Sequence, residues 1–412
     1  MRFRPSTIVA AAVVLVSAVV WAVQYRLAAA SGVGDLPVYE HASRLMRLGE
    51  VPYRDFALEY PPGGAGLFFI TDLLPGSFGA AFSIVMFGFL ALAVAGVTAT
   101  CAALGRSTVG TAVAATVTAG VPLVFASLSQ LRYDLVLTAL LAWLLWAVVT
   151  NRWRAVWTLI GLCLLVKLVP VVLVPLLAVI QAQRDRPTRI ARAMLPGLAL
   201  VLVVVGPLAA VAPSGLWDSV AYHLERPLQI EALGASLLIT AHHLGFGDVA
   251  RVNSYGSDNL LGARADTMAS ISGLVAVVLV LAIVAVVARA SWRRGPDTVI
   301  PVDETIAAVA ATLLAFIAFG KVLSPQYLLW LAPVVGLLGG RRMVPAAVGM
   351  VTATALSYAV FPTLYRSYTE DLAAIPSWLV LARNVVLIAL LIVAWPRLRR
   401  RTEDGQSPAT GM

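Results

Sequence analysis

Charged residues are scarce in this sequence, and long apolar runs take their place. Only 12% of the 412 residues are charged, 60% are hydrophobic, and the mean hydropathy is +0.88. Soluble domains carry about a quarter charged residues, so this composition excludes an ordinary soluble protein and predicts a membrane protein in contact with the lipid bilayer. The net charge of +9 does not indicate a nucleic acid partner, because the basic residues form short clusters between apolar runs. Such clusters are typical of cytoplasmic loops.

Cysteine and histidine are also rare, with two and four residues. Cys101 and Cys163 fall inside apolar runs, where a lone cysteine behaves as a small buried hydrophobe, so we expect no disulfide. The HExxH and CxxC spacings are missing, and we expect neither a protein-bound metal nor another cofactor. The motifs GxxxxGK(S/T), GxGxxG and GxSxG are missing too, which leaves ATP, dinucleotide and serine-hydrolase chemistry without support.

The apolar runs predict an all-α fold, a polytopic transmembrane helix bundle with loops on its outer face. About ten full spans are expected, at 7–29, 80–104, 108–126, 134–149, 193–211, 269–287, 306–320, 328–338, 344–360 and 377–395. Arg2 and Arg4, with LAAAS at 27–31, also resemble a cleaved signal peptide. The first run is long enough to span, so we expect it to be retained. Under both interpretations the next segment lies outside the cytoplasm.

A broken pair of half-helices is expected in the apolar run 155–180. This run lies between the basic patches 151–154 and 184–192, which both indicate the cytoplasm. Lys167 and Pro170 stand three residues apart within it, and proline disrupts a helix. We therefore predict two half-helices that enter from the cytoplasm and return to it. The alternative is a single span with a snorkelling lysine.

This topology predicts a multi-pass plasma-membrane protein with both termini in the cytoplasm. Two large polar loops, 31–79 and 212–268, and the short segments 127–133, 321–326 and 362–376 then share the extracytoplasmic face. The interval 36–48 has the spacing of an interfacial helix that ends at Gly49. We expect a membrane-embedded core over 1–340, C-terminal transmembrane helices over 341–396, and a disordered cytoplasmic tail over 397–412.

Asp35 directly follows the first span, at the boundary between membrane and water. Partial desolvation there favours proton uptake by a carboxylate, as a general base requires. The same residue equally suits the N-cap of the next helix, because Leu36 and Pro37 follow it.

The densest group of polar residues is YRDFALEYPPG at 53–63, with Arg54, Asp55, Glu59 and Tyr60. Pro61 and Pro62 stiffen the chain and hold these side chains in place. Asp55 and Glu59 suit a pair of carboxylates, and the alternative is a surface loop in which Asp55 pairs with Arg54.

Other candidates stand where spans meet the outer face. Arg132 and Asp134 in SQLRYD form an ionisable pair that anchors the interface, or the cation of the pair binds a lipid phosphate. The second loop contributes YHLERPLQIE at 222–231, with candidates His223, Arg226 and Gln229.

Lysine occurs only twice among the 30 basic residues, as Lys167 and Lys321, both near prolines in apolar surroundings. Lys321 opens KVLSPQYLLW, where Gln326 and Tyr327 add hydrogen-bonding groups for a phosphate oxygen. The alternative for Lys321 is snorkelling at the end of a span.

The segment GDLPVYEHASRLMRLGEVPYRDFALEYPPG at 34–63 resembles actinobacterial C-type glycosyltransferases, particularly the polyprenyl-phosphate-mannose transferases of glycosyltransferase family 87. RYD, VKLVP and KVLSPQYLLWLAP resemble the same group. The resemblance implies an inverting transfer of a sugar from a polyprenyl-phosphate donor to an envelope glycolipid or glycan acceptor. It implies mannose as the sugar, with arabinose as an alternative.

The resemblance also implies roles for individual residues. Asp35 matches the acid that takes the proton of the acceptor hydroxyl, while Lys321, Arg132 and Arg226 suit the leaving phosphate. By residue type, Tyr39, Tyr60 and Trp217 are candidates for stacking on sugar rings. The alternative functions are a transporter or flippase for lipid-linked saccharides, in which Lys167 marks the substrate path, and a noncatalytic scaffold.

Overall fold

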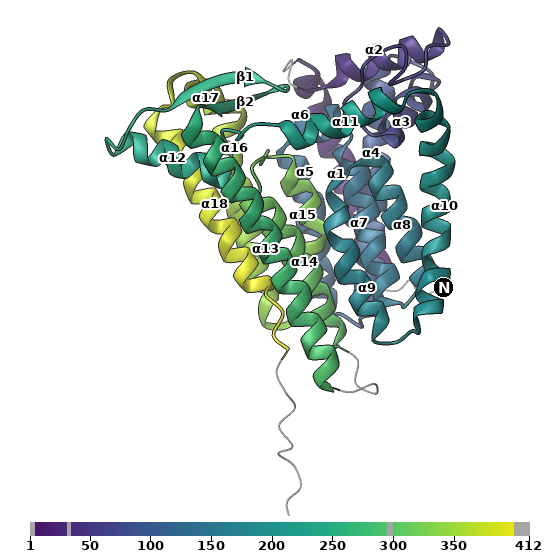
Figure 1. Ribbon diagram of the computed structural model, residues 1–412. Coiled ribbons are helices and arrows are strands. Elements are labelled where there is room, and N and C mark those ends of the chain that lie inside the picture. The colour runs from purple at the N-terminus through teal and green to yellow at the C-terminus, as the bar shows by residue number, and fades with distance from the viewer. Residues whose placement is uncertain (1–4, 31–33, 295–299, 399–412) are drawn as a thin grey trace, which may run out of the picture.

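The computed structural model describes residues 5–30, 34–294 and 300–398 as a bundle of long helices with shorter elements gathered at one end (Figure 1). The helices of the first half are α1 Pro5–Ala30, α2 Leu36–Arg47, α3 Pro62–Asp72, α4 Phe78–Ala103, α5 Thr108–Val124, α6 Ala126–Leu131, α7 Asp134–Val149, α8 Trp153–Val166, the 3-10 helix η1 Val169–Leu173, α9 Val174–Ala182 and α10 Pro187–Val211. The second half comprises α11 Pro213–Glu225, α12 Leu233–His243, the strands β1 Ala250–Ser254 and β2 Ser257–Leu261, α13 Ala263–Arg294, α14 Val302–Phe319, α15 Tyr327–Gly336, the 3-10 helix η2 Gly340–Arg342, α16 Met343–Tyr358, the π-helix η3 Ala359–Leu364, α17 Tyr365–Asp371 and α18 Ala374–Ala394.

The predicted all-α bundle of membrane spans is confirmed. Among the described residues, 7 helices are long and apolar enough to cross a membrane. Shorter apolar helices, including α5, α7 and α15, occupy the places of other predicted spans. The antiparallel hairpin of β1 and β2 is an addition that the sequence did not indicate.

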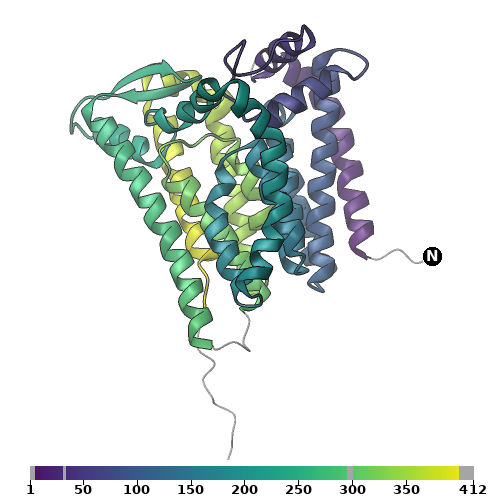
Figure 2. The same cartoon turned by 45° about the vertical axis from the view of Figure 1, so that its right-hand side comes forward.

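The short elements share one end of the bundle, as predicted for the outer loops. This end carries α2, α3, α11, α12, α17 and the hairpin, and we call it the loop end (Figure 1). The beginning of α1 and the end of α18 lie at the opposite end (Figure 2). The predicted interfacial helix is α2, which ends at Arg47. Residues 31–33 of the first predicted loop and 399–412 of the predicted tail lie outside the described residues.

The predicted break at Lys167 is confirmed. α8 ends at Val166, and Lys167 has the extended backbone φ −151°, ψ 138°. The Lys167 ammonium lies 3.0 Å from the carboxylate of Asp134, at the start of α7. At the other end of the pair, Arg184 donates to Asn151. α8 and α9 therefore leave the end opposite the loops, turn at Lys167 near the loop end, and return, so the single-span alternative is wrong.

The segment 127–133, predicted as an outer connection, is largely buried. α6 packs on α1 and α4, and its Gln130 has no exposed surface. Trp21 Nε1 donates to Ser83 Oγ at 3.0 Å, Ser83 Oγ donates to Gln130 Oε1 at 3.1 Å, and Gln130 Nε2 donates to the Trp21 carbonyl at 3.2 Å. These buried bonds fix the position of α6, because breaking one leaves an unpaired polar group.

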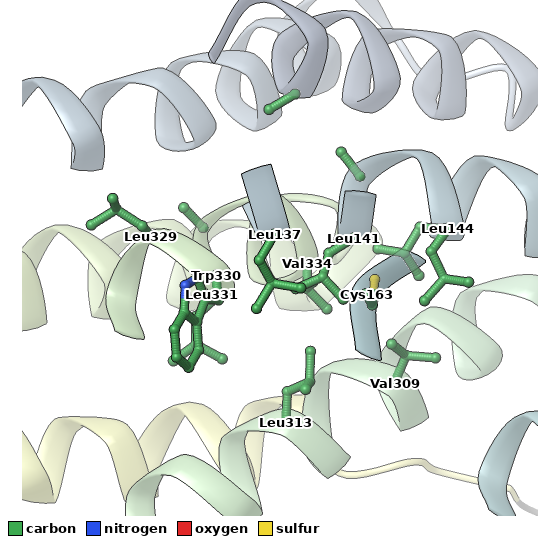
Figure 3. Packing of buried hydrophobic residues seen from close by; sticks show 14 of the residues in the cluster. Leu137, Leu141, Leu144, Cys163, Val309, Leu313, Leu329, Trp330, Leu331 and Val334 are labelled. Carbon is green, nitrogen blue, oxygen red and sulfur yellow. The ribbon is translucent and has the colours of Figure 1, made fainter. Parts of the chain in front are cut away.

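The main apolar core lies between α7, α8, α14 and α15. Leu137 and Leu141 of α7 pack near Leu313 of α14 and Val334 of α15 (Figure 3). The predicted C-terminal helices join this core, since α16 packs on α5 and α18 packs on α14. The core is thus a continuous support under the loop end.

A buried ion pair anchors the second predicted loop inside the bundle. The carboxylate of Glu231 lies 3.1 Å from Arg383 of α18, and their side chains are only 3% and 1% exposed. Arg383 and Asn384 also donate to the Glu231 carbonyl, at 2.7 and 3.2 Å. Because Arg383 is nine residues into α18, this part of the loop reaches roughly 13 Å along the helix.

We expect Arg383→Met to lower the stability of the protein strongly. Removing one partner leaves Glu231 as an uncompensated buried charge, which costs about 3–5 kcal/mol. Replacing both partners, Glu231→Leu with Arg383→Met, should restore much of the loss, because an apolar pair tolerates this environment. Thermal unfolding of the detergent-solubilised protein checks this, and a double variant as unstable as Arg383→Met alone would contradict it.

Candidate active site

Asp35 stands at the start of α2, but it does not cap that helix with its side chain. Its Oδ1 instead lies 3.1 Å from Arg132 Nη2, and its Oδ2 accepts a hydrogen bond of 3.2 Å from the Tyr39 hydroxyl. The carboxylate and the guanidinium remain 28% and 22% exposed, so solutes can reach both. The side-chain cap that the sequence equally suited is therefore not formed.

Gly34 allows this approach of Asp35 to Arg132. Its φ of +139° is one that side-chain-bearing residues rarely adopt, and a Cβ there would lie 2.8 Å from the Leu131 Cβ. Glycine is therefore required where the start of α2 passes the end of α6.

Tyr39 belongs to a buried aromatic group rather than to an open sugar platform. The residue has no exposed surface, and its ring stacks on Phe68 with centroids 4.1 Å apart. Tyr60, Tyr133 and Phe82 lie around it at 5.2, 5.7 and 5.4 Å. The predicted stacking of Tyr39 on a sugar is wrong, because its ring faces are covered by other rings. Only its hydroxyl reaches the site.

Arg132 connects two motifs that are far apart in the sequence. Besides its contact with Asp35, its Nη1 donates to Gln326 Oε1, in the segment that follows Lys321. Arg132 Nε is buried and has no hydrogen-bond partner among the described residues. The guanidinium thus joins the start of α2 to the start of α15.

Asp134 and Lys167 form a second ion pair beside the first. Trp330 Nε1 donates to Asp134 Oδ1 at 2.9 Å, and the Lys167 ammonium lies 4.5 Å from the centre of the Tyr133 ring. Tyr327 stacks on Trp330 with centroids 4.2 Å apart. Arg132 and Asp134, which are neighbours in SQLRYD, therefore pair with different partners. Lys167 therefore lies near the loop end, beside the start of α7.

Arg226 and Lys321 add positive charge that no carboxylate offsets. No acidic side chain lies within 4.0 Å of either cation in the described part of the chain. Arg226 Nη2 donates to Ser257 Oγ at 2.9 Å, and Lys321 Nζ donates to the Leu224 carbonyl at 2.6 Å. Burial lowers the pKa of Lys321, and the nearby Arg226 lowers it further.

His223 ties α11 to the first loop. Its Nε2 lies 3.1 Å from the Glu59 carbonyl. Its pKa is lowered by burial and also by the positive charges of Arg226 and Lys167. The pKa of the Glu59 carboxyl is raised by burial and by the charge of Asp35. The contact between His223 and the Glu59 carbonyl therefore brings the end of α11 next to the first loop.

Gln229 has a structural position in this arrangement. Its N–H donates to the Lys321 carbonyl at 2.9 Å, and its Oε1 accepts from the Leu323 N–H at 3.0 Å. These bonds fasten the segment after α11 to the segment before α15. Gln229 is therefore placed to hold Lys321 in position.

Arg54 and Asp55 lie apart from this cluster. Arg54 pairs with Asp55 at 2.8 Å, and both side chains are exposed, at 48% and 32%. Hydrogen bonds from Arg54 and from the Val51 N–H lower the pKa of Asp55 to about 2. The sequence alternative of a charge-paired surface loop is the arrangement observed, and no Asp55–Glu59 pair accompanies it.

Some residues of the cluster were not expected from the sequence. Trp330 lies within the KVLSPQYLLW segment, so its motif was visible although its bond to Asp134 was not. Tyr222 of α11 opens the YHLERPLQIE segment, but its contact with Tyr255 of the hairpin, beside Arg226, had no sequence signal. Within the described ranges, no group of three or more His, Cys, Asp or Glu side chains could hold a metal ion.

Most of the chain resembles a known protein family. The sequence model of glycosyltransferase family 87 matches residues 58–325, more than half of the chain. The matched interval includes Glu59, Arg132, Lys167, Arg226 and Lys321, and it begins after Asp35. A comparison with curated proteins gave no match. Because the family model covers most of the bundle and of the charged cluster, this multi-pass membrane protein belongs to glycosyltransferase family 87.

Proposed function

We propose that this glycosyltransferase moves a sugar, mannose, from a polyprenyl-phosphate donor to a hydroxyl of an envelope glycolipid or glycan. The observation that carries the proposal is the carboxylate of Asp35, which is partly exposed, is not used as a cap, and contacts Arg132 and Tyr39. Asp35 acts as the general base. The reaction inverts the anomeric carbon, because the acceptor displaces the phosphate in one step.

The transfer moves one proton and replaces one bond at the anomeric carbon by another. Asp35 takes the proton of the acceptor hydroxyl, and the hydroxyl oxygen forms a bond to the anomeric carbon. The bond between that carbon and the phosphate oxygen breaks, and polyprenyl phosphate leaves with the electron pair. Fixed cations stabilise the charge that develops on the phosphate, since they need no reorganisation during the reaction.

Arg226 and Lys321 are the groups best suited to the donor phosphate. They are cationic, lie at the loop end, and have no acidic partner in the described part of the chain. Arg132 and Lys167 add two further charges, each shared with a carboxylate. An anionic lipid headgroup is the substrate that such an excess of cations favours.

The orientation in the membrane follows from the arginine-rich loops. Arg152 directly precedes α8, Arg184 follows α9, and Arg342 directly precedes α16, with Arg184 bonded to Asn151 and Arg342 to Glu304. These helix ends lie at the end opposite the loop end (Figure 1). The positive-inside rule assigns that end to the cytoplasm. The loop end then faces the extracytoplasmic side of the plasma membrane, and both termini are cytoplasmic.

We expect Asp35→Asn to reduce transfer at least about a hundredfold, because asparagine cannot accept the proton. The assay uses membranes that contain the protein, radiolabelled polyprenyl-phosphate-mannose and a native lipid extract as acceptor. Asp72→Asn is the matched control, since Asp72 is an acid of the same predicted loop that pairs with Arg47 on the surface. Equal product from Asp35→Asn and the wild type at equal protein levels would overturn the assignment of the base.

We expect Arg226→Gln and Lys321→Gln each to raise the half-saturating donor concentration about tenfold, the effect of losing one charge-assisted hydrogen bond. The half-saturating acceptor concentration should stay unchanged. Arg366→Gln serves as control, because Arg366 is an exposed cation of α17 that pairs with Glu370. A donor dependence equal to that of the wild type would remove both residues from the phosphate site.

We expect Tyr39→Phe to lower kcat for transfer about tenfold, while the half-saturating concentrations of donor and acceptor stay unchanged. Phenylalanine keeps the aromatic packing but no longer donates to Asp35, so the carboxylate loses one of the two contacts that position it. The measurement is the initial rate of transfer at saturating donor and acceptor. Tyr133→Phe is the control, since its hydroxyl donates to the Val166 carbonyl instead. The same loss of kcat in both variants, or none in Tyr39→Phe, would contradict a positioning role for the Tyr39 hydroxyl.

A further inference from the structure

The β1–β2 hairpin has an unusual residue in its turn. The two residues between the strands, Tyr255 and Gly256, have φ of +52° and +62°. A two-residue turn with both φ positive is the type that Asn-Gly or Gly-Gly usually occupies. A bulky tyrosine at positive φ is an outlier, which the chain tolerates only when the surroundings hold it. We therefore expect contacts outside the turn to hold Tyr255 at this φ.

The tip of the hairpin reaches across to α11. The rings of Tyr255 and Tyr222 lie with centroids 5.2 Å apart and planes tilted by 53°. Ser257, directly after the turn, accepts a hydrogen bond of 2.9 Å from Arg226. In Figure 1 the hairpin extends from the α12 and α17 side of the loop end toward α11. Two aromatic rings from opposite sides of the loop end thus meet beside a cation of the active site.

Strand β2 of the hairpin is hydrogen-bonded to the segment around Gln229. The Ile230 N–H donates to the Asp258 carbonyl at 3.0 Å, and the Leu260 N–H donates to the Leu228 carbonyl at 2.9 Å. Because Gln229 also holds the Lys321 segment, the position of the hairpin is fixed relative to the charged cluster.

Tyr222 also lies close to Glu59 of the first loop. Its ring and the ring of His223 have centroids 5.3 Å apart, and His223 Nε2 lies 3.1 Å from the Glu59 carbonyl. Burial raises the pKa of Tyr222, and the negative charge of Glu59 raises it further. Glu59 itself is half-buried and has no cation within 4.0 Å among the described residues. A half-buried carboxylate without an ion-pair partner, on the segment that α11 contacts beside two tyrosines, has the chemistry of a carbohydrate site, where hydroxyls donate to the acid and the apolar ring face lies on an aromatic.

We propose that Glu59, Tyr222 and Tyr255 form the subsite for the sugar ring of the acceptor, next to the base Asp35. The apolar face of a pyranose packs on the tyrosine pair, and its hydroxyls donate to the Glu59 carboxylate. One of its hydroxyls then faces Asp35 for deprotonation. This inference rests on the proposed function, and it assigns the residues that hold the sugar ring of the proposed acceptor.

The test measures initial rates of transfer in membranes that contain the protein. In one series the concentration of the native lipid extract is varied at a fixed concentration of radiolabelled polyprenyl-phosphate-mannose, and in a second series the donor concentration is varied at a fixed amount of extract. Tyr222→Ala and Tyr255→Gly should each raise the half-saturating extract concentration about tenfold, and leave the half-saturating donor concentration unchanged. Tyr255→Gly removes the ring and relaxes the positive φ at once, so a loss cannot come from a strained turn. Tyr222→Phe keeps the ring and should recover most of the affinity for the extract that Tyr222→Ala loses.

Phe246→Ala is the control for removing an aromatic ring from the loop end, because Phe246 is 72% exposed and lies after α12. An unchanged half-saturating extract concentration in both Tyr222→Ala and Tyr255→Gly overturns the subsite. A rise of the half-saturating donor concentration by the same factor as that of the extract also overturns it. A wild type that forms no product from this donor overturns the proposed function and the subsite with it. A working wild type with unaffected variants overturns the subsite alone.

Discussion

The ion pair between Asp35 and Arg132 is the junction on which the site depends. It joins the start of α2 to the end of α6, and Arg132 extends the connection to Gln326 before α15. Asp35 and Gln326 are almost three hundred residues apart, so the contact forms only after the bundle has packed. The buried bonds of Gln130 to α1 and α4 hold α6 in the required place. The chemistry at the loop end is therefore set by polar contacts within the bundle.

Interrupted helices bring several helix ends to the same level. α2, α7 and α15 all begin beside the charged cluster, at Leu36, Asp134 and Tyr327. The N-terminus of a helix carries partial positive charge, so three such ends add to the cations already present. Irregular backbone between membrane helices, as at Lys167, is tolerated where it is covered by protein or borders a polar site. The breaks in the helices therefore add positive potential where the proposed anionic donor would bind.

The sequence predicted the bundle and much of the site because both depend on local patterns. Apolar runs located the helices, and the rarity of lysine pointed to Lys167 and Lys321, which both lie at the cluster. Contacts between distant segments carried no such signal. The burial of Tyr39, the reach of Tyr255 to α11, and the pairing of Glu231 with Arg383 follow from how the helices pack, which a single sequence does not encode in any local pattern. Arg54 and Asp55 had the composition of a site but form a surface pair.

Charge balance explains why this cluster suits the proposed transfer. Arg132, Lys167, Arg226 and Lys321 give four positive charges, and the carboxylates of Asp35, Glu59 and Asp134 give three negative ones, so the net charge is +1 with His223 neutral. A sugar phosphodiester carries one negative charge, and the leaving monoester approaches two. When Asp35 takes the acceptor proton, the protein loses one negative charge as the phosphate gains one. The cluster thus matches the substrate charge before and after the bond breaks, without moving any side chain.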